Sequence, residues 1–301
     1  MPKPKVIVVS GSDDAFVPLA RDLFTSIRDH SYKYEFDLGL LDIGLSDDNR
    51  AGFEKQNIRV EKVRAEGDID YPARRIWEAE RPACKVFTAK PFLPRYFPGY
   101  DIYLWLDADI WVQTHDAIDA LIEGSAESNA LHIAMEFDRC YSLFFQKPQV
   151  WHMYHEWYQA CFNDDNVTAH MTLKPMLNVG VFAMSKNAPV WNAWQKIYAD
   201  ILQRTPQLNS KTIMLEQLAL NVAVYMMNLP YVPMPASYNW LTVLAMPMLD
   251  KKTGMYVEPL PPHAPISQFH LTHKPKEQAQ KIACIGGGFI ERPLLYSARN
   301  T

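Results

Sequence analysis

Hydrophobic and polar residues follow one another in blocks that predict alternating strands and helices. The first apolar run, Val6 to Val9, is β-branched and ends at small and acidic residues, which predicts a buried strand followed by a polar loop. Apolar residues then recur at helical spacing from Phe16 to Ile27. A second strand is predicted over 34–41, a polar helix over 47–56 and a third strand over 58–63. This order predicts an α/β fold in which helices cover both faces of a sheet.

The middle of the chain contains its most apolar strand. Residues 101–106, DIYLWL, predict a central strand buried on both faces, and they lead directly into Asp107-Ala108-Asp109. A helix is predicted over 83–93, and Pro91 is expected to kink it because proline has no backbone N–H to donate. The remaining pattern predicts strands over 131–135 and 177–184, and helices over 151–161, 188–204 and 215–227.

The composition changes after Met227, where eight prolines fall between residues 230 and 265. Prolines exclude long helices and central strands, so this segment is predicted to form an irregular wrap packed on the rest of the chain. Gly286-Gly287-Gly288 predicts a mobile tail. We expect one domain over 1–276 and a C-terminal tail over 277–301 that packs on it or extends from it.

Charge and composition disfavour several classes of protein. The chain has 301 residues, of which 30 are Lys or Arg and 34 are Asp or Glu, for a net charge of −4. A non-specific nucleic-acid binder needs a basic surplus, so no nucleic-acid partner is expected. The four cysteines form no CxxC pair, which argues against a zinc ribbon or a disulfide scaffold. Since no apolar run has the length of a signal-peptide core or a membrane span, a cytoplasmic protein is expected, with membrane-surface attachment left open.

The pair Asp107 and Asp109 carries the sharpest chemical signal. In an extended segment residues i and i+2 project to the same side, so both carboxylates can reach one cation. Carboxylate oxygens suit Mg²⁺ or Mn²⁺, and ligands of open α/β sheets bind at the carboxyl ends of strands. Two solvated aspartates in a turn are the ordinary alternative. A phosphatase of the haloacid dehalogenase type is a weaker one, because Trp111 stands where that family has threonine or valine.

Six segments, read in order, carry a family resemblance. They are 6–16 (VIVVSGSDDAF), Lys90 with 92–94 (FLP), 103–112 (YLWLDADIWV), 177–182 (LNVGVF), 216–221 (EQLALN) and 266–276 (ISQFHLTHKPK). Together they resemble glycosyltransferase family eight, the retaining enzymes of the GT-A fold that use nucleotide-sugar donors. The DxD segment is the most specific of the six, and the resemblance spans almost the whole chain.

The resemblance implies a GT-A fold with a mixed, mostly parallel sheet and helices on both faces. It implies that the protein is a hexosyltransferase that moves a hexose from a UDP-sugar to a hydroxyl of a carbohydrate or glycoconjugate acceptor, with retention at the anomeric carbon. Mn²⁺ or Mg²⁺ would be the cofactor, held by Asp107, Asp109 and His270. His273 is the alternative third ligand, and an imidazole favours Mn²⁺ over Mg²⁺.

The same resemblance implies a set of donor-binding residues. The first strand and its acidic loop would hold the nucleoside, and lysines would neutralise the diphosphate. A lysine stands where the family has an arginine, so it lacks the bidentate fork, and the terminal lysine motif is altered. A strand glycine would admit the sugar near the backbone, although such a glycine is also typical of close packing. The residues are Ser10, Asp13, Lys90, Gly180, Lys274 and Lys276.

Three residues are the catalytic candidates. Asn178 is expected to hydrogen-bond sugar hydroxyls. In same-face attack the leaving phosphate takes the acceptor proton, and Gln217 would steady the oxocarbenium-like centre. Glu216, a glutamate where the family has an aspartate, is the runner-up as a covalent nucleophile. An acidic residue at the start of a helix is also ordinary capping chemistry.

Two other functions stay open at this point. A nucleotidyltransferase of related fold would attack a phosphate instead of an anomeric carbon. A decayed nucleotide-sugar-binding protein would keep the fold without the reaction. The aromatic segment 151–158, WHMYHEWY, contains His152, His155 and Glu156, but its HxxHE order is not the HExxH of metalloproteases. We interpret that segment as a packing face or an acceptor contact.

Overall fold

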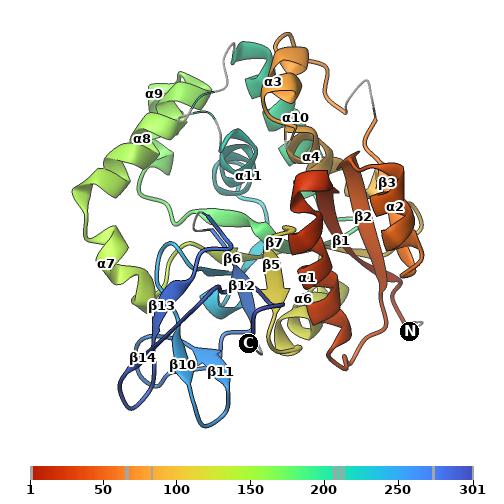
Figure 1. The fold of residues 1–301 in the computed structure, drawn as a ribbon. Coiled ribbons are helices and arrows are strands. Elements are labelled where there is room, and N and C mark those ends of the chain that lie inside the picture. The colour runs from red at the N-terminus through yellow and green to blue at the C-terminus, as the bar shows by residue number, and fades with distance from the viewer. Residues whose placement is uncertain are drawn as a thin grey trace.

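A seven-stranded sheet forms the centre of the structure, a computed structural model that describes residues 3–64, 68–82, 84–205, 209, 212, 214–272 and 275–299 (Figure 1). The strands are β1 (Val6–Asp13), β2 (Asp37–Gly44), β3 (Ile58–Lys62), β4 (Ile102–Leu106), β6 (Leu131–Met135), β7 (Leu177–Ser185) and β8 (Tyr231–Met234). Their order is β3-β2-β1-β4-β7-β6-β8. Because β7 runs antiparallel to β4 and β6 while the other neighbours are parallel, the sheet is mixed and mostly parallel, as predicted.

Helices cover both faces of this sheet because side chains alternate between the faces along each strand. In β1, Val6 and Val8 belong to one apolar cluster, whereas Ile7 and Val9 belong to another. The first cluster includes residues of α1 (Val17–Arg28), α2 (Asp47–Glu54) and α6 (Asp116–Glu127). The second includes residues of α3 (Arg74–Glu80), α4 (Cys84–Ala89), α5 (Leu93–Tyr96), α8 (Pro148–Phe162), α9 (Asp165–Met171), α10 (Val190–Arg204) and α11 (Leu215–Met226).

The helix predicted over 83–93 is interrupted at Pro91, as expected. α4 ends at Ala89, and a 3-10 turn follows before α5 begins. At this break Lys90 turns into the interior, where it is 1% exposed. The short connecting elements of the chain are η1 (Asp14–Phe16), η2 (Lys90–Phe92), η3 (Arg139–Tyr141), α7 (Ser142–Phe145) and η4 (Ala236–Tyr238).

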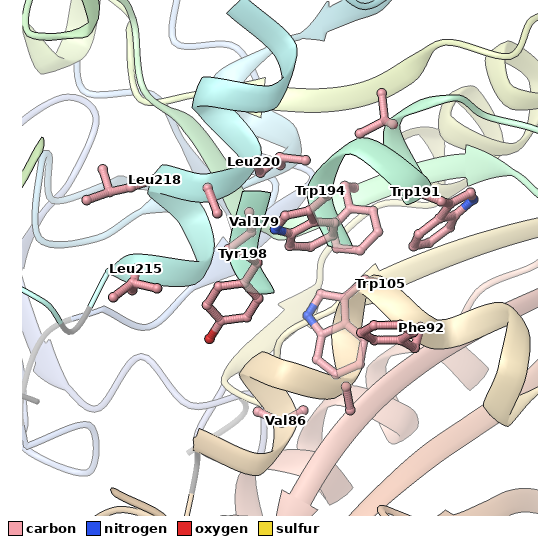
Figure 2. Close-up of a cluster of buried hydrophobic side chains, with 14 of the residues drawn as sticks. Val86, Phe92, Trp105, Val179, Trp191, Trp194, Tyr198, Leu215, Leu218 and Leu220 are labelled. Carbon is pink, nitrogen blue, oxygen red and sulfur yellow. The ribbon is translucent and has the colours of Figure 1, made fainter. Parts of the chain in front are cut away.

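Tryptophans fill the core beside the carboxyl end of β4. Trp105 of β4 belongs to the same buried cluster as Trp191 and Trp194 of α10, and Figure 2 shows their side chains. Trp194 packs edge-to-face on Phe182 of β7, with 5.6 Å between the ring centroids. Its Nε1 donates to the backbone carbonyl of Glu216 at 3.0 Å. The first turn of α11 is therefore tied to both α10 and the sheet.

A three-stranded sheet adjoins the main one and was not predicted. It consists of β5 (Ile110–Val112), β12 (Gln268–His270) and β9 (Trp240–Leu241), in the order β5-β12-β9. Trp111 of β5 stacks on Phe269 of β12, with centroids 4.5 Å apart and planes inclined by 19°. Its Nε1 donates to the carbonyl of Leu294 at 2.8 Å. Chain segments far apart in sequence thus meet immediately after Asp107-Ala108-Asp109.

The C-terminal third forms short strands at the periphery, consistent with its prolines. β8 contains Pro233 and lies at the edge of the main sheet, where a missing N–H breaks no ladder. Residues 277–301 contribute Ile282 and Leu294 to a buried cluster with Trp111, and the division at 276 stays a prediction. The two-stranded sheets comprise β10 (Met248–Asp250) with β11 (Met255–Val257), and β13 (Gln280–Ala283) with β14 (Phe289–Arg292).

The three glycines expected to mark a mobile tail instead form the turn between β13 and β14. Gly286, Gly287 and Gly288 all have positive φ, and the N–H of Cys284 donates to the Gly288 carbonyl at 3.0 Å. Glycine adopts this backbone conformation without the clash that a Cβ would cause. In the described part of the chain, no helix is long and apolar enough to cross a membrane.

Replacing Trp111 tests how far the small sheet depends on this packing. Trp111→Ala removes a fully buried indole and the hydrogen bond to Leu294, so we expect the free energy of unfolding to fall by about 3–5 kcal/mol. Urea denaturation measures the change. The control is Trp151→Ala, because Trp151 is only partly buried and should cost less. Equal losses in the two variants would contradict the assigned role of Trp111.

Candidate functional site

Asp107 and Asp109 lie in a tight turn that joins the two sheets. The N–H of Ile110 donates to the Asp107 carbonyl at 3.0 Å and closes the turn. The N–H of Asp107 donates to the Gly180 carbonyl in β7 at 2.9 Å and fixes the turn to the main sheet. The extended conformation expected for this segment is therefore wrong, because the chain changes sheets here. The turn nevertheless carries both carboxylates to the same cavity.

The register of the small sheet brings His270 to this turn. β12 runs antiparallel to β5 with His270 opposite Ile110, and the N–H of Leu271 donates to the Asp109 carbonyl at 2.9 Å. As a result, ligand atoms of Asp107, Asp109 and His270 all lie within 4.8 Å of one another. The residues predicted as metal ligands are thus brought together from positions more than 160 residues apart. His273, the alternative ligand, lies outside the described residues.

One oxygen of each aspartate is held by a donor from the protein. Asp107 Oδ1 accepts a hydrogen bond from Trp105 Nε1 at 2.7 Å and pairs with Lys90 Nζ at 2.9 Å. Asp109 Oδ2 pairs with Lys276 Nζ. These contacts fix the orientation of both carboxyl groups. The second oxygen of each group, Asp107 Oδ2 and Asp109 Oδ1, is not engaged by these donors.

The second oxygens face the imidazole of His270. His270 Nε2 lies 3.7 Å from Asp107 Oδ2 and 3.4 Å from Asp109 Oδ1. Both separations exceed the 2.7–2.9 Å of a direct charge-assisted hydrogen bond. Two carboxylate oxygens and an imidazole nitrogen are a ligand set that suits Mn²⁺. The residues present therefore fit a divalent cation.

The charge of Asp109 is stabilised by its neighbours. Burial opposes ionisation of this carboxyl group, but His270 and Lys276 outweigh burial and hold its pKa well below the usual range. A carboxylate that stays ionised is the form that binds a metal. Asp109 is therefore held in the ionised form.

Lys90 lies between two carboxylates. Its Nζ is 2.9 Å from Asp107 Oδ1 and 2.9 Å from Glu216 Oε1, and 4.9 Å from the centre of the Trp105 ring. Burial opposes the charge of Lys90, but Asp107 and Glu216 outweigh it and raise the lysine pKa. Burial raises the pKa of Glu216 to about 7, although Lys90 opposes this shift.

Glu136 lies at the centre of a polar network that the sequence did not predict. Its Oε1 accepts from Asn178 Nδ2 at 2.7 Å and from Gln217 Nε2 at 3.0 Å, and its Oε2 accepts from the Tyr154 hydroxyl at 3.1 Å. Gln217 Oε1 in turn accepts from the N–H of Val179 at 3.1 Å. Burial raises the pKa of Glu136, and the three donors oppose that shift. The available signal was its position directly after the predicted strand 131–135, the same position that Asp107 holds after its strand.

Gly180 leaves room for His270. A Cβ added to Gly180 would lie 2.5 Å from His270 Cε1 and 2.8 Å from Asn178 Oδ1. The glycine is therefore required by protein packing at the metal-ligand cluster. Admission of the sugar near this backbone, the role inferred from the sequence, stays a prediction.

Comparison with known proteins identifies the family. The sequence profile described as Glycosyl transferase family 8 matches residues 7–275. The chain belongs to this family. A comparison with curated proteins finds no match.

Solved structures show the same fold. Galactosyltransferase LgtC in complex with donor and acceptor sugar analogues superposes with a TM-score of 0.52 at 16% identity, over 89% of this chain and 87% of LgtC. An active-site mutant of LgtC gives 0.52 at 17% identity, over 88% and 86% of the two chains. The GT-A glycosyltransferase fold predicted from the sequence is confirmed.

Most of the predicted site residues of this family 8 enzyme line one cavity of about 400 Å³. Ser10 is fully buried in β1 and Asp13 caps η1 through its side chain, and neither lines this cavity. Lys274 lies outside the described residues. The predicted residues that line the cavity are Lys90, Asp107, Asp109, Asn178, Gly180, Glu216, Gln217, His270 and Lys276.

Replacing Gly180 tests the packing against His270. In Gly180→Ala the new methyl group overlaps the imidazole, so we expect the free energy of unfolding to fall by about 1–3 kcal/mol. Urea denaturation measures it. Gly52→Ala on α2 is the control, because the nearest atom to its Cβ is 3.9 Å away and alanine favours the helix. A Gly180→Ala variant as stable as the control would show that the ring is free to move.

Proposed function

We propose that this family 8 enzyme is a metal-dependent, retaining hexosyltransferase that uses a UDP-sugar donor and an acceptor hydroxyl. The observation that carries the proposal is the cluster of Asp107, Asp109 and His270 at the wall of the cavity that Glu136 and Gln217 also line. The cluster and the polar network around Glu136 therefore line one cavity. That combination supports breaking a bond between a sugar and a diphosphate.

The diphosphate would bind beside the ligand cluster. Asp107, Asp109 and His270 would hold Mn²⁺ or Mg²⁺, which acts as a Lewis acid and neutralises charge on the departing diphosphate. Lys276 and Arg81 line the same cavity, and the guanidinium of Arg81 has the fork that grips phosphate oxygens. Lys90 is paired with two carboxylates, so we assign it to fixing Asp107. The remaining donor residues from the sequence, Ser10, Asp13 and Lys274, stay proposals for the nucleoside and phosphate.

Retention is proposed to follow same-face attack. The acceptor hydroxyl loses its proton to the leaving phosphate as its oxygen bonds the anomeric carbon on the face that the phosphate leaves. Glu136 suits the task of balancing positive charge at that carbon, because no lysine or arginine in the described part of the chain forms a salt bridge with it. Glu216 is neutralised by Lys90 and is the weaker candidate. Gln217 and Asn178 orient Glu136 through their amides.

The acceptor is proposed to lie against the apolar wall of the cavity. Phe144, Met153 and Trp157 of α7 and α8 line one part of it, and Val243 and Leu244 line another. The carbon-bound hydrogens of a sugar ring present an apolar face, which packs on aromatic and aliphatic side chains. The aromatic segment 151–158 thus fits the acceptor contact suggested by the sequence.

Metal removal tests the reaction class directly. Chelation of divalent cations, or Asp109→Ala, should lower UDP release from UDP-hexoses more than about 100-fold, since Lewis-acid stabilisation contributes several kcal/mol. Mn²⁺ should restore the chelated wild type but not the variant. Slow donor hydrolysis provides the assay because it needs no acceptor. Full activity in chelator would exclude the metal-dependent mechanism. In a separate assay with UTP and a hexose 1-phosphate, pyrophosphate release would indicate a nucleotidyltransferase.

Glu136→Gln tests the proposed charge balance. The variant keeps the shape of the side chain but removes its charge, so kcat should fall about 100- to 1000-fold while UDP affinity changes less than about twofold. Gln217→Ala should lower kcat less, because it removes an orienting contact only. Glu216→Gln is the matched carboxylate control. A sugar adduct on Glu136 or Glu216, seen by mass spectrometry of the native enzyme, would replace same-face attack with double displacement.

A further inference from the structure

A chain of buried amides leads from the backbone of β7 to the metal-ligand cluster. It begins at the N–H of Gly180, which donates to Asn178 Oδ1 at 2.9 Å. A backbone N–H can only donate, so this contact decides which end of the Asn178 side chain is oxygen. The Asn178 Nδ2 group then points the other way and donates to Glu136 Oε1 at 2.7 Å. The orientation of Asn178 is therefore fixed at both ends.

The same constraint passes to Asn239. Asn239 Nδ2 donates to Asn178 Oδ1 at 2.9 Å, because that oxygen can only accept. Asn239 Oδ1 must then be the atom that lies 3.0 Å from His270 Nδ1. An amide oxygen accepts, so the proton of the neutral imidazole sits on Nδ1. The other nitrogen, Nε2, keeps its lone pair and is the atom that faces Asp107 and Asp109.

We propose that Asn239 is a positioning residue that fixes His270 as the Nδ1–H tautomer and aims the Nε2 lone pair at the metal site. Its consequence for the reaction rests on the proposed metal dependence, whereas the tautomer itself does not. Asn239 is 2% exposed, and its side-chain amide contacts Asn178 through Nδ2 and His270 through Oδ1. Histidine ligands of metals commonly donate their second N–H to such a partner, which sets the ring orientation and the ligand strength.

Reversing the amides is disfavoured by the same contacts. If Asn239 turned over, its oxygen would face Asn178 Oδ1 and its NH₂ would face His270. If Asn178 turned as well, its NH₂ would face the N–H of Gly180 and its oxygen would face Glu136. Each reversal leaves like groups opposed in a buried place, where unpaired polar groups are costly. The backbone N–H of Gly180 thus determines the tautomer of His270, through Asn178 and Asn239.

The tautomer is measured by ¹⁵N NMR of the imidazole nitrogens in metal-free protein, at a pH high enough that the His270 signals no longer change with pH. The His270 signal is assigned by its absence in His270→Gln. We expect a protonated Nδ1 and an unprotonated Nε2 in the wild type. Asn239→Leu should lose this preference, whereas Asn239→Asp keeps an acceptor and should retain it. An unchanged tautomer in Asn239→Leu, or a protonated Nε2 in the wild type, overturns the proposal.

Metal affinity is measured separately by electron paramagnetic resonance of Mn²⁺ alone. Asn239→Leu should raise the Mn²⁺ dissociation constant about 10- to 100-fold, and Asn239→Asp should recover most of the loss. Asn221→Ala is the matched control, since Asn221 is also buried and, among the residues that the structure describes, its side chain bonds to backbone groups of Leu177 and Gln217. Equal losses of affinity in Asn221→Ala and Asn239→Leu would show general loosening and overturn the positioning role.

The two readouts separate this proposal from the proposed function. A wild type with the expected tautomer that binds no Mn²⁺ refutes metal dependence while it supports the role of Asn239 in fixing the ring. In the opposite case, the wild type binds Mn²⁺ and the His270 tautomer is the same in Asn239→Leu as in the wild type. That result refutes the role of Asn239 and leaves metal dependence intact. Far-ultraviolet circular dichroism and urea unfolding confirm that each variant is folded before either measurement.

Discussion

A buried positive charge beneath the site is the constraint on which its geometry depends. The ammonium of Lys90 has almost no access to water, and removing a charge from water is costly unless partners are close. Asp107 at the end of β4 and Glu216 at the start of α11 supply those partners at 2.9 Å. The ion pairs therefore tie the break after α4, the end of a central strand and the first turn of a helix into one fixed arrangement. Trp105 completes it by donating to the same oxygen of Asp107.

The site consists of two systems with different physical roles. Lys90 pairs with one oxygen of Asp107, and Lys276 pairs with one oxygen of Asp109. These ion pairs fix where the other oxygen of each aspartate lies. Neutral amides hold His270 and Glu136 by hydrogen-bond direction, which fixes where protons and lone pairs lie. Charge contributes strength but little directional information, whereas an amide chain anchored on a backbone N–H has only one satisfied orientation. The two systems meet at β7. There Gly180 leaves space for the imidazole of His270, and Asn178 links the carboxylate of Glu136 to the hydrogen-bonded amides.

Sequence reasoning was accurate where long periodic segments or a contiguous motif carried the signal. The strand predicted over 101–106, the break at Pro91 and the pair of carboxylates after the strand are all present in the structure. It failed for β5 and β12, because three-residue strands are too short for periodicity to show. Glu136 and Asn239 were missed because their roles arise from tertiary contacts and not from local pattern. The prediction of an extended conformation at Asp107 was wrong because the sequence does not show that the chain passes from one sheet to the other there.

Lys90 and Glu216 are two positions where the resemblance read from the sequence implies a different residue, an arginine and an aspartate respectively. Lysine ends in a compact ammonium without the arginine fork, while glutamate extends one methylene farther than aspartate. In the structure the two side chains meet at 2.9 Å, so the longer acid reaches the simpler cation. Because that cation also pairs with Asp107 at 2.9 Å, the contact between Lys90 and Glu216 helps to fix the first aspartate of the Asp107-Ala108-Asp109 turn in place.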